Sequence, residues 1–427
     1  MIAGPWRWLE IAVLIGGTVL LGPLTAVPRA AENGDVARES IDPWADFDPR
    51  AEPLDAERVR EWREEGIVLR LVEYRIGTFL GKPARMAAFF ACPDRPGRFP
   101  GLLHLHGGGQ RASVEEVAFH ARQGYACLSI NWGGREMDRA EAGDRTTDWG
   151  AVDPTQRDPS GYFDLRPRPG ALDPFESPRN CHWYLLTIGA RRGLTFLESR
   201  PEVDPDRLGV YGHSMGGTLS IYVAGSDARV KAVAPSCGGS GFRTEPWPLL
   251  PEVTLERPPG DAALFAATLG LESSARRIGA PLLWLGGTND FHGIMDDTYR
   301  TGALVRGADV RYAFTPHMNH RLSPEVAVTR SLWFDRWLRD GDALPATPAT
   351  TLLLADSDGV PRLRVEPEKP AEVDEVRVYY SVDPDPRARF WRSGQVTRDG
   401  DAWSALLPLL STDAPLFAFA QVRWRIA

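Results

Sequence analysis

Residues 203–217 read VDPDRLGVYGHSMGG and contain the pattern Gly-x-Ser-x-Gly, with Ser214 at its centre. The apolar segment Leu208–Tyr211 in front of the pattern predicts a short strand, and Met215–Ala224 behind it predicts a helix. A serine on such a sharp strand-to-helix turn needs neighbours without bulk, which accounts for the glycines on either side. The start of the following helix also favours developing negative charge. Ser214 is therefore the candidate nucleophile.

Short apolar segments alternate with helical patterns on both sides of this motif. Further strand segments lie at residues 101–106, 125–131, 230–234, 281–285 and 310–315. Between them are one-sided helical patterns, such as the apolar positions spaced by three and four along residues 183–197. This alternation predicts an α/β domain, a mostly parallel sheet with helices on both faces, over residues 67–341. Two long insertions, 134–180 and 238–270, interrupt it and are candidate binding loops.

The residue patterns at the two ends of the chain differ from that of the α/β domain. Residues 1–31 contain Arg7, an apolar run and small residues, in the order of a secretory signal peptide, with an uncleaved anchor as the alternative. Residues 32–66 predict an irregular arm and a short helix near residues 55–65. Residues 351–427 form short alternating segments separated by turns, which predict a small all-β, immunoglobulin-like module.

The charge balance indicates which partners are disfavoured, and the N-terminal pattern indicates the compartment. The 49 basic and 57 acidic side chains give a formal net charge of −8, which disfavours a nucleic-acid-binding protein. The signal pattern predicts a secreted or periplasmic protein without a membrane span once the signal is removed. No metal or organic cofactor is expected, because no residue spacing is typical of a metal site.

Export makes disulfides possible for the four cysteines. Cys92 and Cys127 lie in apolar segments and are expected to be buried thiols. Cys181 and Cys237 lie where loops should meet over the sheet, so a bridge between them is left open.

A nucleophilic serine needs a histidine base, which should follow it and an acid in the chain. His317 and His320 lie in the loop after the strand segment 310–315. We favour His320 as the base, because a short turn ending in histidine after a strand is the usual presentation. His317 then becomes a candidate substrate contact.

The acid is expected just after the preceding strand segment, 281–285. Asp290 ends the loop GGTND at this position, whereas Asp296 and Asp297 fall in the next predicted helix. Asp290 would hold the tautomer of His320 and stabilise its protonated ring.

The negative charge that develops on a substrate carbonyl oxygen needs backbone N–H donors. One should come from Met215, the residue after the nucleophile. The second should come from the glycine run after the strand segment 101–106, with Gly108 favoured and Gly109 as the alternative.

Together these segments resemble the α/β-hydrolase superfamily. The segments that carry the resemblance are GLLHLHGGGQRASVEEVAFHARQGYACLSINWGG from Gly101, VDPDRLGVYGHSMGG, GGTND and PHMNH. Within it, the chain is most similar to dienelactone-hydrolase-like and acetylxylan-esterase-like secreted bacterial hydrolases, over about residues 67–340. The resemblance implies Ser214 as nucleophile, Asp290 as acid, His320 as base, and oxyanion donors at Met215 and near Gly108. Dienelactone hydrolases proper use a cysteine nucleophile, so the serine favours an esterase.

Three functions remain as hypotheses. The first is a secreted serine esterase that acts on a small ester or on short acyl groups of a carbohydrate. The others are a peptidase or amidase on the same scaffold, and a non-catalytic binding protein of the envelope. The insertions carry aromatic side chains that are candidate sugar contacts, in particular Trp149 and Trp247, although such rings also pin loops to a domain.

Overall fold

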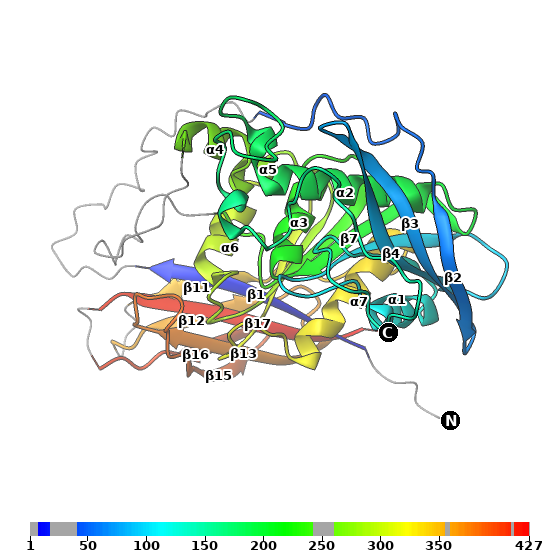
Figure 1. Cartoon of the computed structure of the whole chain (residues 1–427). Coiled ribbons are helices and arrows are strands. Elements are labelled where there is room, and N and C mark those ends of the chain that lie inside the picture. Colours follow the sequence, from blue (N-terminus) through cyan, green and yellow to red (C-terminus); the bar gives the residue numbers. More distant parts are fainter. Residues whose placement is uncertain (1–6, 18–40, 242–259, 355–358, 411–413, 427) are drawn as a thin grey trace.

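The computed structural model describes residues 7–17, 41–241, 260–354, 359–410 and 414–426 (Figure 1). A large twisted sheet with helices forms one part, and two smaller antiparallel sheets form the other. The α/β domain and the all-β module expected from the sequence are both present.

The central sheet has nine strands in the order β10-β9-β8-β7-β5-β6-β4-β3-β2. The strands from β10 to β6 in this order run parallel, and β4, β3 and β2 add an antiparallel edge. Their bounds are β2 Glu57–Glu64, β3 Ile67–Phe79, β4 Lys82–Pro93, β5 Phe99–Leu105, β6 Ala126–Ile130, β7 Val203–His213, β8 Val230–Ser236, β9 Leu282–Gly287 and β10 Val310–Thr315.

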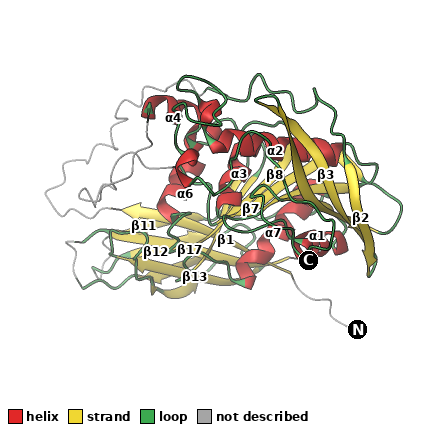
Figure 2. Ribbon diagram, in the orientation of Figure 1, coloured by secondary structure: helices red, strands yellow, loops and turns green. Residues whose placement is uncertain are grey.

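Helices cover both faces of this sheet, as Figure 2 shows. Buried side chains of α2, α3 and α5 belong to one apolar cluster, and those of α1 and α7 belong to a second. The helices are α1 Val114–Arg122, α2 His182–Glu198, α3 Met215–Ala224, α4 Ala262–Thr268, α5 Leu271–Ala275, α6 Met295–Gly302 and α7 Pro324–Leu338. Ser113 and Ser323 cap α1 and α7, because each side chain accepts a hydrogen bond from the first turn. The two-faced coverage explains why the parallel strands are mostly buried and carry continuous apolar segments.

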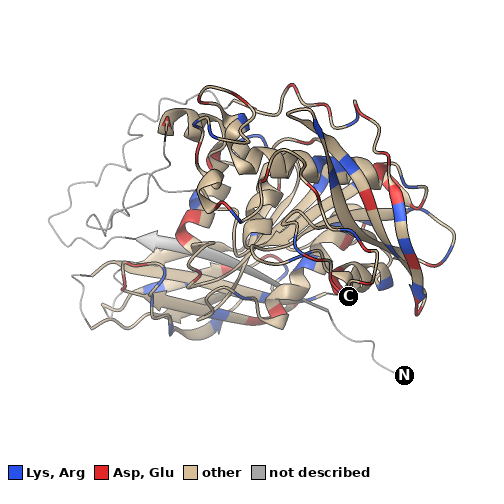
Figure 3. Ribbon diagram, viewed as in Figure 1, with Lys and Arg blue, Asp and Glu red and all other residues tan. Residues whose placement is uncertain are grey.

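The short helix predicted near residues 55–65 is wrong, because this segment forms the edge strand β2. Val59 and Trp62 are three residues apart, which is a helical spacing. In the structure a bulge between Arg58 and Arg60 inserts Val59 as an extra residue, so that both apolar side chains pack against the same cluster. The remaining side chains of β2 are all charged, and both basic and acidic residues occur along β2 and β3 (Figure 3).

The β-module consists of two four-stranded sheets, in the orders β1-β17-β13-β14 and β11-β12-β16-β15, with β1 (Arg7–Gly17) supplied by the N-terminal segment. Side chains of both sheets share one buried cluster, which also includes Leu332 of α7. The strands are β11 Ala349–Leu353, β12 Arg362–Glu366, β13 Val373–Ser381, β14 Arg392–Ser393, β15 Gln395–Asp399, β16 Ala402–Leu406 and β17 Leu416–Ile426. The arrangement agrees with an all-β module in the C-terminal part of the chain, but β1 comes from the N-terminus and β11 begins at Ala349, before the expected range 351–427.

The N-terminal apolar segment takes an extended conformation. Strand β1 (Arg7–Gly17) pairs antiparallel with β17, from Arg7 opposite Ile426 to Gly17 opposite Leu416. Among the described residues, no helix is long and apolar enough to cross a membrane.

The cysteine bridge that the sequence left open is absent from the structure. All four cysteines are buried and free. Cys181 instead donates its thiol to the carbonyl oxygen of Tyr162 at 2.8 Å. Cys237 follows β8 and lies beside the candidate active site.

Candidate active site

Ser214 sits on the sharp turn that the sequence predicts. Strand β7 ends at His213 and α3 begins at Met215, with Ser214 between them at φ +58° and ψ −121°. A positive φ is uncommon for a serine and marks a strained conformation that the surrounding fold must hold. One restraint is the hydrogen bond from the backbone N–H of Ser214 to the carbonyl oxygen of Ser236, at 2.8 Å.

The glycines around Ser214 are required by close packing of the backbone. A Cβ atom at Gly216 would overlap the carbonyl oxygen of Leu105 at the end of β5. A Cβ atom at Gly212 would lie 2.5 Å from the carbonyl group of Gly216. The elbow therefore forms only if both positions lack a side chain.

The structure brings His320 to Ser214 and Asp290. His320 Nε2 lies 2.8 Å from Ser214 Oγ, and His320 Nδ1 lies 3.0 Å from each carboxylate oxygen of Asp290. The His320 side chain is 24% exposed, and the Asp290 side chain is fully buried. The histidine thus bridges the hydroxyl and the carboxylate, which is the arrangement that activates a serine.

Asp290 is held as an anion by several donors. The backbone N–H groups of His292 and Gly293 donate to its Oδ1 at 2.7 and 2.9 Å. Burial alone raises the pKa of Asp290, but the bonds from His320 and from these two N–H groups bring it below its ordinary value. Asp296 and Asp297, the weaker acid candidates, lie on α6 and pair with Arg389 and Arg300 instead.

The two residues predicted to donate to an oxyanion are neighbours in space. A Cβ atom at Gly108 would lie 2.6 Å from Met215 Sδ, so the glycine run passes directly beside the first turn of α3. Gly107 donates its N–H to Gln110 Oε1 at 3.0 Å, and Gly109 donates to Gln156 Oε1. Within the described part of the chain, the Gly108 N–H has no assigned acceptor, which favours it over Gly109.

Gln156 is a residue at this site that the sequence did not indicate. Its side chain accepts from the Gly109 N–H, and its Nε2 lies 3.1 Å from Met215 Sδ. It belongs to the insertion 134–180, so this insertion reaches the oxyanion region. No pattern marks a single glutamine in a long irregular segment, and only the folded chain reveals its position.

A cluster of hydrogen-bonded polar side chains surrounds Ser236, whose backbone oxygen accepts from Ser214. Ser236 Oγ donates to the carbonyl oxygen of Gly212 at 3.1 Å and accepts from Arg330 at 3.3 Å. His213 Nδ1 lies 3.2 Å from the same Ser236 Oγ and therefore carries the proton of this bond. Burial lowers the pKa of His213 to about 4, so that its ring is neutral at neutral pH.

The three predicted substrate contacts have different outcomes. Trp149 is 4% exposed, and its ring N–H donates to the carbonyl oxygen of Trp132. It therefore pins the insertion to the domain, which was the alternative interpretation. Trp247 lies outside the described residues. His317 is exposed, and its ring lies 6.0 Å from that of Tyr379 in the β-module.

Phe291 is an exposed aromatic side chain that lies beside the candidate base. Its ring is 60% exposed and its centroid lies 4.7 Å from that of His320. It directly follows Asp290 in the sequence, so the acid itself was the signal that could have pointed to it.

Comparisons with known proteins agree with this fold. Residues 68–238 match the acetyl xylan esterase (AXE1) family model, and residues 186–321 match the dienelactone hydrolase family. An acetyl xylan esterase from Paenibacillus sp. R4 superposes with a TM-score of 0.51 at 20% identity, over 68% of this chain and 91% of that one. The chain has the α/β-hydrolase fold. Both family models that match parts of it describe hydrolases.

Further relatives of this α/β-hydrolase are more distant. The YtaP protein of Bacillus subtilis (strain 168) is 26% identical over 199 residues, which are 44% of this chain and 59% of that protein. The match thus spans less than two thirds of this relative. An acetyl xylan esterase from Thermoanaerobacterium sp. JW/SL YS485 has a TM-score of 0.48 at 16% identity, over 67% of this chain and 88% of that one.

Proposed function

We propose that this α/β-hydrolase cleaves carboxylic esters through an acyl-enzyme on Ser214. The observation that carries the proposal is the continuous chain of contacts from Ser214 Oγ through His320 to Asp290, at 2.8 and 3.0 Å. A hydroxyl, an imidazole and a buried carboxylate in this order provide a nucleophile, a base and a group that orients the base.

Each group has one task in the reaction. Ser214 Oγ attacks the ester carbonyl carbon while His320 Nε2 takes its proton. Asp290 holds the proton on Nδ1 and stabilises the charged ring. His320 then protonates the leaving alcohol, and the same base activates a water molecule that releases the acid from Ser214.

The carbonyl oxygen becomes negatively charged at each of these steps. We assign its stabilisation to the backbone N–H groups of Met215 and Gly108, because the glycine run passes beside the first turn of α3. Met215 also begins α3, whose first turn favours negative charge. A donor of this kind contributes about 3 kcal/mol to the transition state.

We further propose that the substrate carries a short acyl group on a carbohydrate. The family match to acetyl xylan esterases and the exposed Phe291 ring beside His320 support this choice, because an aromatic face offers a platform for a sugar ring. In this account residues 1–31 direct export, and N-terminal sequencing of the protein recovered from outside the cytoplasm tests that part.

The decisive experiment compares p-nitrophenyl acetate with longer-chain esters and with an acetylated xylan oligosaccharide. We expect rapid release of acetate from both acetyl substrates, slower turnover of long chains, and loss of activity in Ser214→Ala. A Phe291→Ala variant should raise KM for the oligosaccharide more than for the small ester. Cleavage of peptide amides, or no turnover of any ester, would contradict the proposal.

A further inference from the structure

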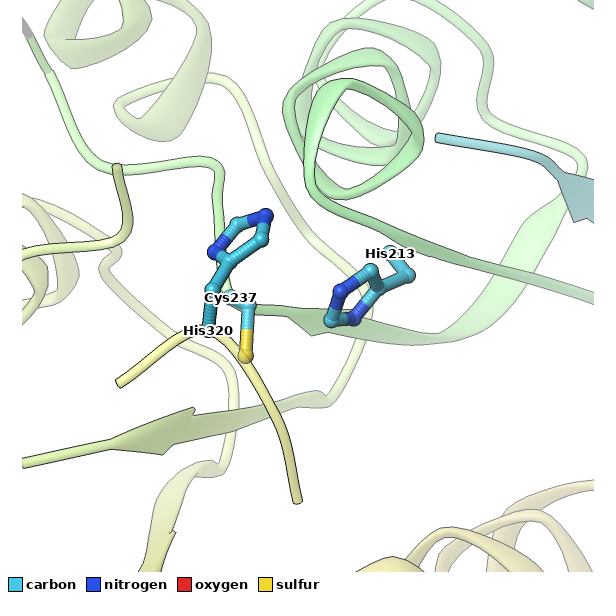
Figure 4. Close-up of side chains that lie close together, drawn as sticks. All are labelled: His213, Cys237 and His320. Carbon is cyan, nitrogen blue, oxygen red and sulfur yellow. The ribbon is translucent and has the colours of Figure 1, made fainter. Parts of the chain in front are cut away.

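Three side chains with metal-binding atoms lie close together, as Figure 4 shows, and one of them, His320, contacts Ser214. They are His213 at the end of β7, Cys237 after β8, and His320 in the loop after β10. One ligand atom from each lies within 4.8 Å of the other two. The residues are far apart in sequence, which is why no ligand spacing was visible there.

His213, the first of these ligands, has one ring nitrogen that carries no proton. His213 Nδ1 donates to Ser236 Oγ, whose own proton is used in the bond to Gly212. The neutral His213 ring therefore keeps an unprotonated Nε2. A neutral imidazole held through its other nitrogen is the usual form of a histidine metal ligand.

Cys237 supplies the second ligand and is held in a fixed position. Its backbone has φ +50°, and its N–H donates to the carbonyl oxygen of Leu285 at 2.9 Å. Burial and the neighbouring Asp290 carboxylate raise the pKa of the Cys237 thiol. A divalent cation reverses this balance, because it attracts the carboxylate as well as the thiolate.

We propose that His213, Cys237 and His320 form a binding site for a thiophilic divalent cation such as Zn²⁺, which inhibits the enzyme when bound. Two imidazoles and one thiolate suit Zn²⁺, and a set of three protein ligands leaves a position for water. Binding releases the thiol proton of Cys237 to solvent and leaves the oxidation state of the cation unchanged.

The cation would inhibit the enzyme whether it binds Nδ1 or Nε2 of His320. Bound to Nε2, it occupies the lone pair that receives the proton of Ser214. Bound to Nδ1, it displaces the proton that Asp290 holds. The inhibition rests on the proposed role of His320 as base, whereas binding of the cation does not.

Binding is tested on the full-length chain with Ser214→Ala, so that the result is independent of turnover. Titration with Co²⁺ should produce the ultraviolet absorption of a cobalt–thiolate bond, saturating at one cation per chain and disappearing when Zn²⁺ is added. Adding Cys237→Ala should abolish this absorption. Cys92→Ala, which removes another buried thiol, should leave it intact.

His213→Asn provides a second variant that keeps the thiol. It should weaken Co²⁺ binding at least about tenfold, the scale of effect found when the surroundings of a metal site are changed. A cobalt–thiolate absorption that survives Cys237→Ala, or none in the parent protein, would overturn the site.

Inhibition is tested separately with the wild-type chain and p-nitrophenyl acetate. Zn²⁺ should abolish turnover, and a chelator should restore it. The Zn²⁺ concentration for half inhibition should rise at least about tenfold in Cys237→Ala but not in Cys92→Ala. Equal inhibition of all three proteins, or stimulation by Zn²⁺, would overturn the inhibitory role. A wild type without esterase activity contradicts the proposed function alone, because the cobalt titration still reports on the site.

Discussion

Arg389 of the β-module forms a two-pronged ion pair with Asp296 of α6, with Nη1–Oδ1 and Nη2–Oδ2 distances of 2.5 and 2.8 Å. The Arg389 side chain is 1% exposed, and its guanidinium lies 3.6 Å from the centroid of the Phe417 ring. Its carbonyl oxygen accepts from Asn289 Nδ2 at 2.7 Å. Asn289 directly precedes Asp290, and Asp296 follows it in α6. The β-module therefore contacts the chain both before and after the candidate acid.

Replacement of Arg389 should therefore destabilise the enzyme and disturb the acid. Arg389→Met leaves Asp296, whose side chain is 21% exposed, without its charge-assisted hydrogen bonds, so we expect the unfolding free energy to fall by about 2 kcal/mol. We expect this loss in urea unfolding, together with a lower kcat for acetate esters. The double variant Arg389→Met/Asp296→Leu should recover part of the stability. An unchanged unfolding midpoint in the single variant would refute the structural role of this pair.

Gly216 is predicted to be intolerant of any side chain. Gly216→Ala would drive a Cβ atom into the carbonyl oxygen of Leu105, so we expect a marked fall in melting temperature or no folded protein. Gly279→Ala is the matched control, because no atom of the described residues lies within 4 Å of the place its Cβ would take, and its φ is not positive. The control should melt close to the wild type. Similar melting temperatures for the two variants would contradict the packing account.

Much of this fold follows from local patterns in the sequence. The capping serines, the alternation of strands with helices, and the glycines around Ser214 each depend on a few neighbouring residues. Strand β2 was missed because a bulge at Val59 is set by its pairing with β3, which the helical spacing of Val59 and Trp62 conceals. The contact between the acid loop and Arg389 joins residues about a hundred positions apart, and no local pattern predicts it.

In the candidate site, too, some residues can be predicted from local sequence patterns and others cannot. Ser214, Asp290 and His320 follow strands in a fixed order, so their positions in the chain were sufficient to select them. Gln156 and the side chain of Cys237 reach the site only through the packing of loops. Trp149 was singled out because it is aromatic and lies in an insertion, but aromatic rings serve equally well as buried anchors.

Asp290 should be essential for turnover and dispensable for folding. Asp290→Asn leaves the shape of the side chain but no longer selects the required tautomer of His320. Loss of this control over the His320 tautomer should lower kcat by about 10³- to 10⁴-fold. Steady-state kinetics should show this fall in kcat, with thermal unfolding as the check on folding.

Asp297→Asn is the matched control for this variant, because Asp297 is also a buried carboxylate but lies on α6 and pairs with Arg300. It should keep kcat within a few-fold of the wild type. Comparable kcat values for the two variants would show that Asp290 is not the acid.

Buried histidines should make the enzyme less stable in mild acid. Burial lowers the pKa of His106 and of His120 to about 3, whereas both rings return to about 6.5 in the unfolded chain. Between these values only the unfolded chain binds the two protons, so the unfolding free energy falls as the pH drops below about 6.5. The slope is about 1 kcal/mol per pH unit for each ring.

Urea unfolding at pH 7, 6 and 5 measures this slope. His120→Gln removes one of the two rings. The slope of the unfolding free energy against pH should therefore fall by about 1 kcal/mol per pH unit, whatever the effect of the substitution on stability at pH 7. An identical decline in the variant and the wild type would contradict the assignment of the slope to His120.

Covalent labelling tests whether Ser214 is the nucleophile that His320 activates. The protein is treated with a serine-directed phosphonate, digested, and analysed by mass spectrometry. We expect a single adduct on the peptide that contains Ser214, absent from Ser214→Ala and formed far more slowly in His320→Gln. No adduct on this peptide, or an adduct that forms equally fast without His320, would contradict this assignment.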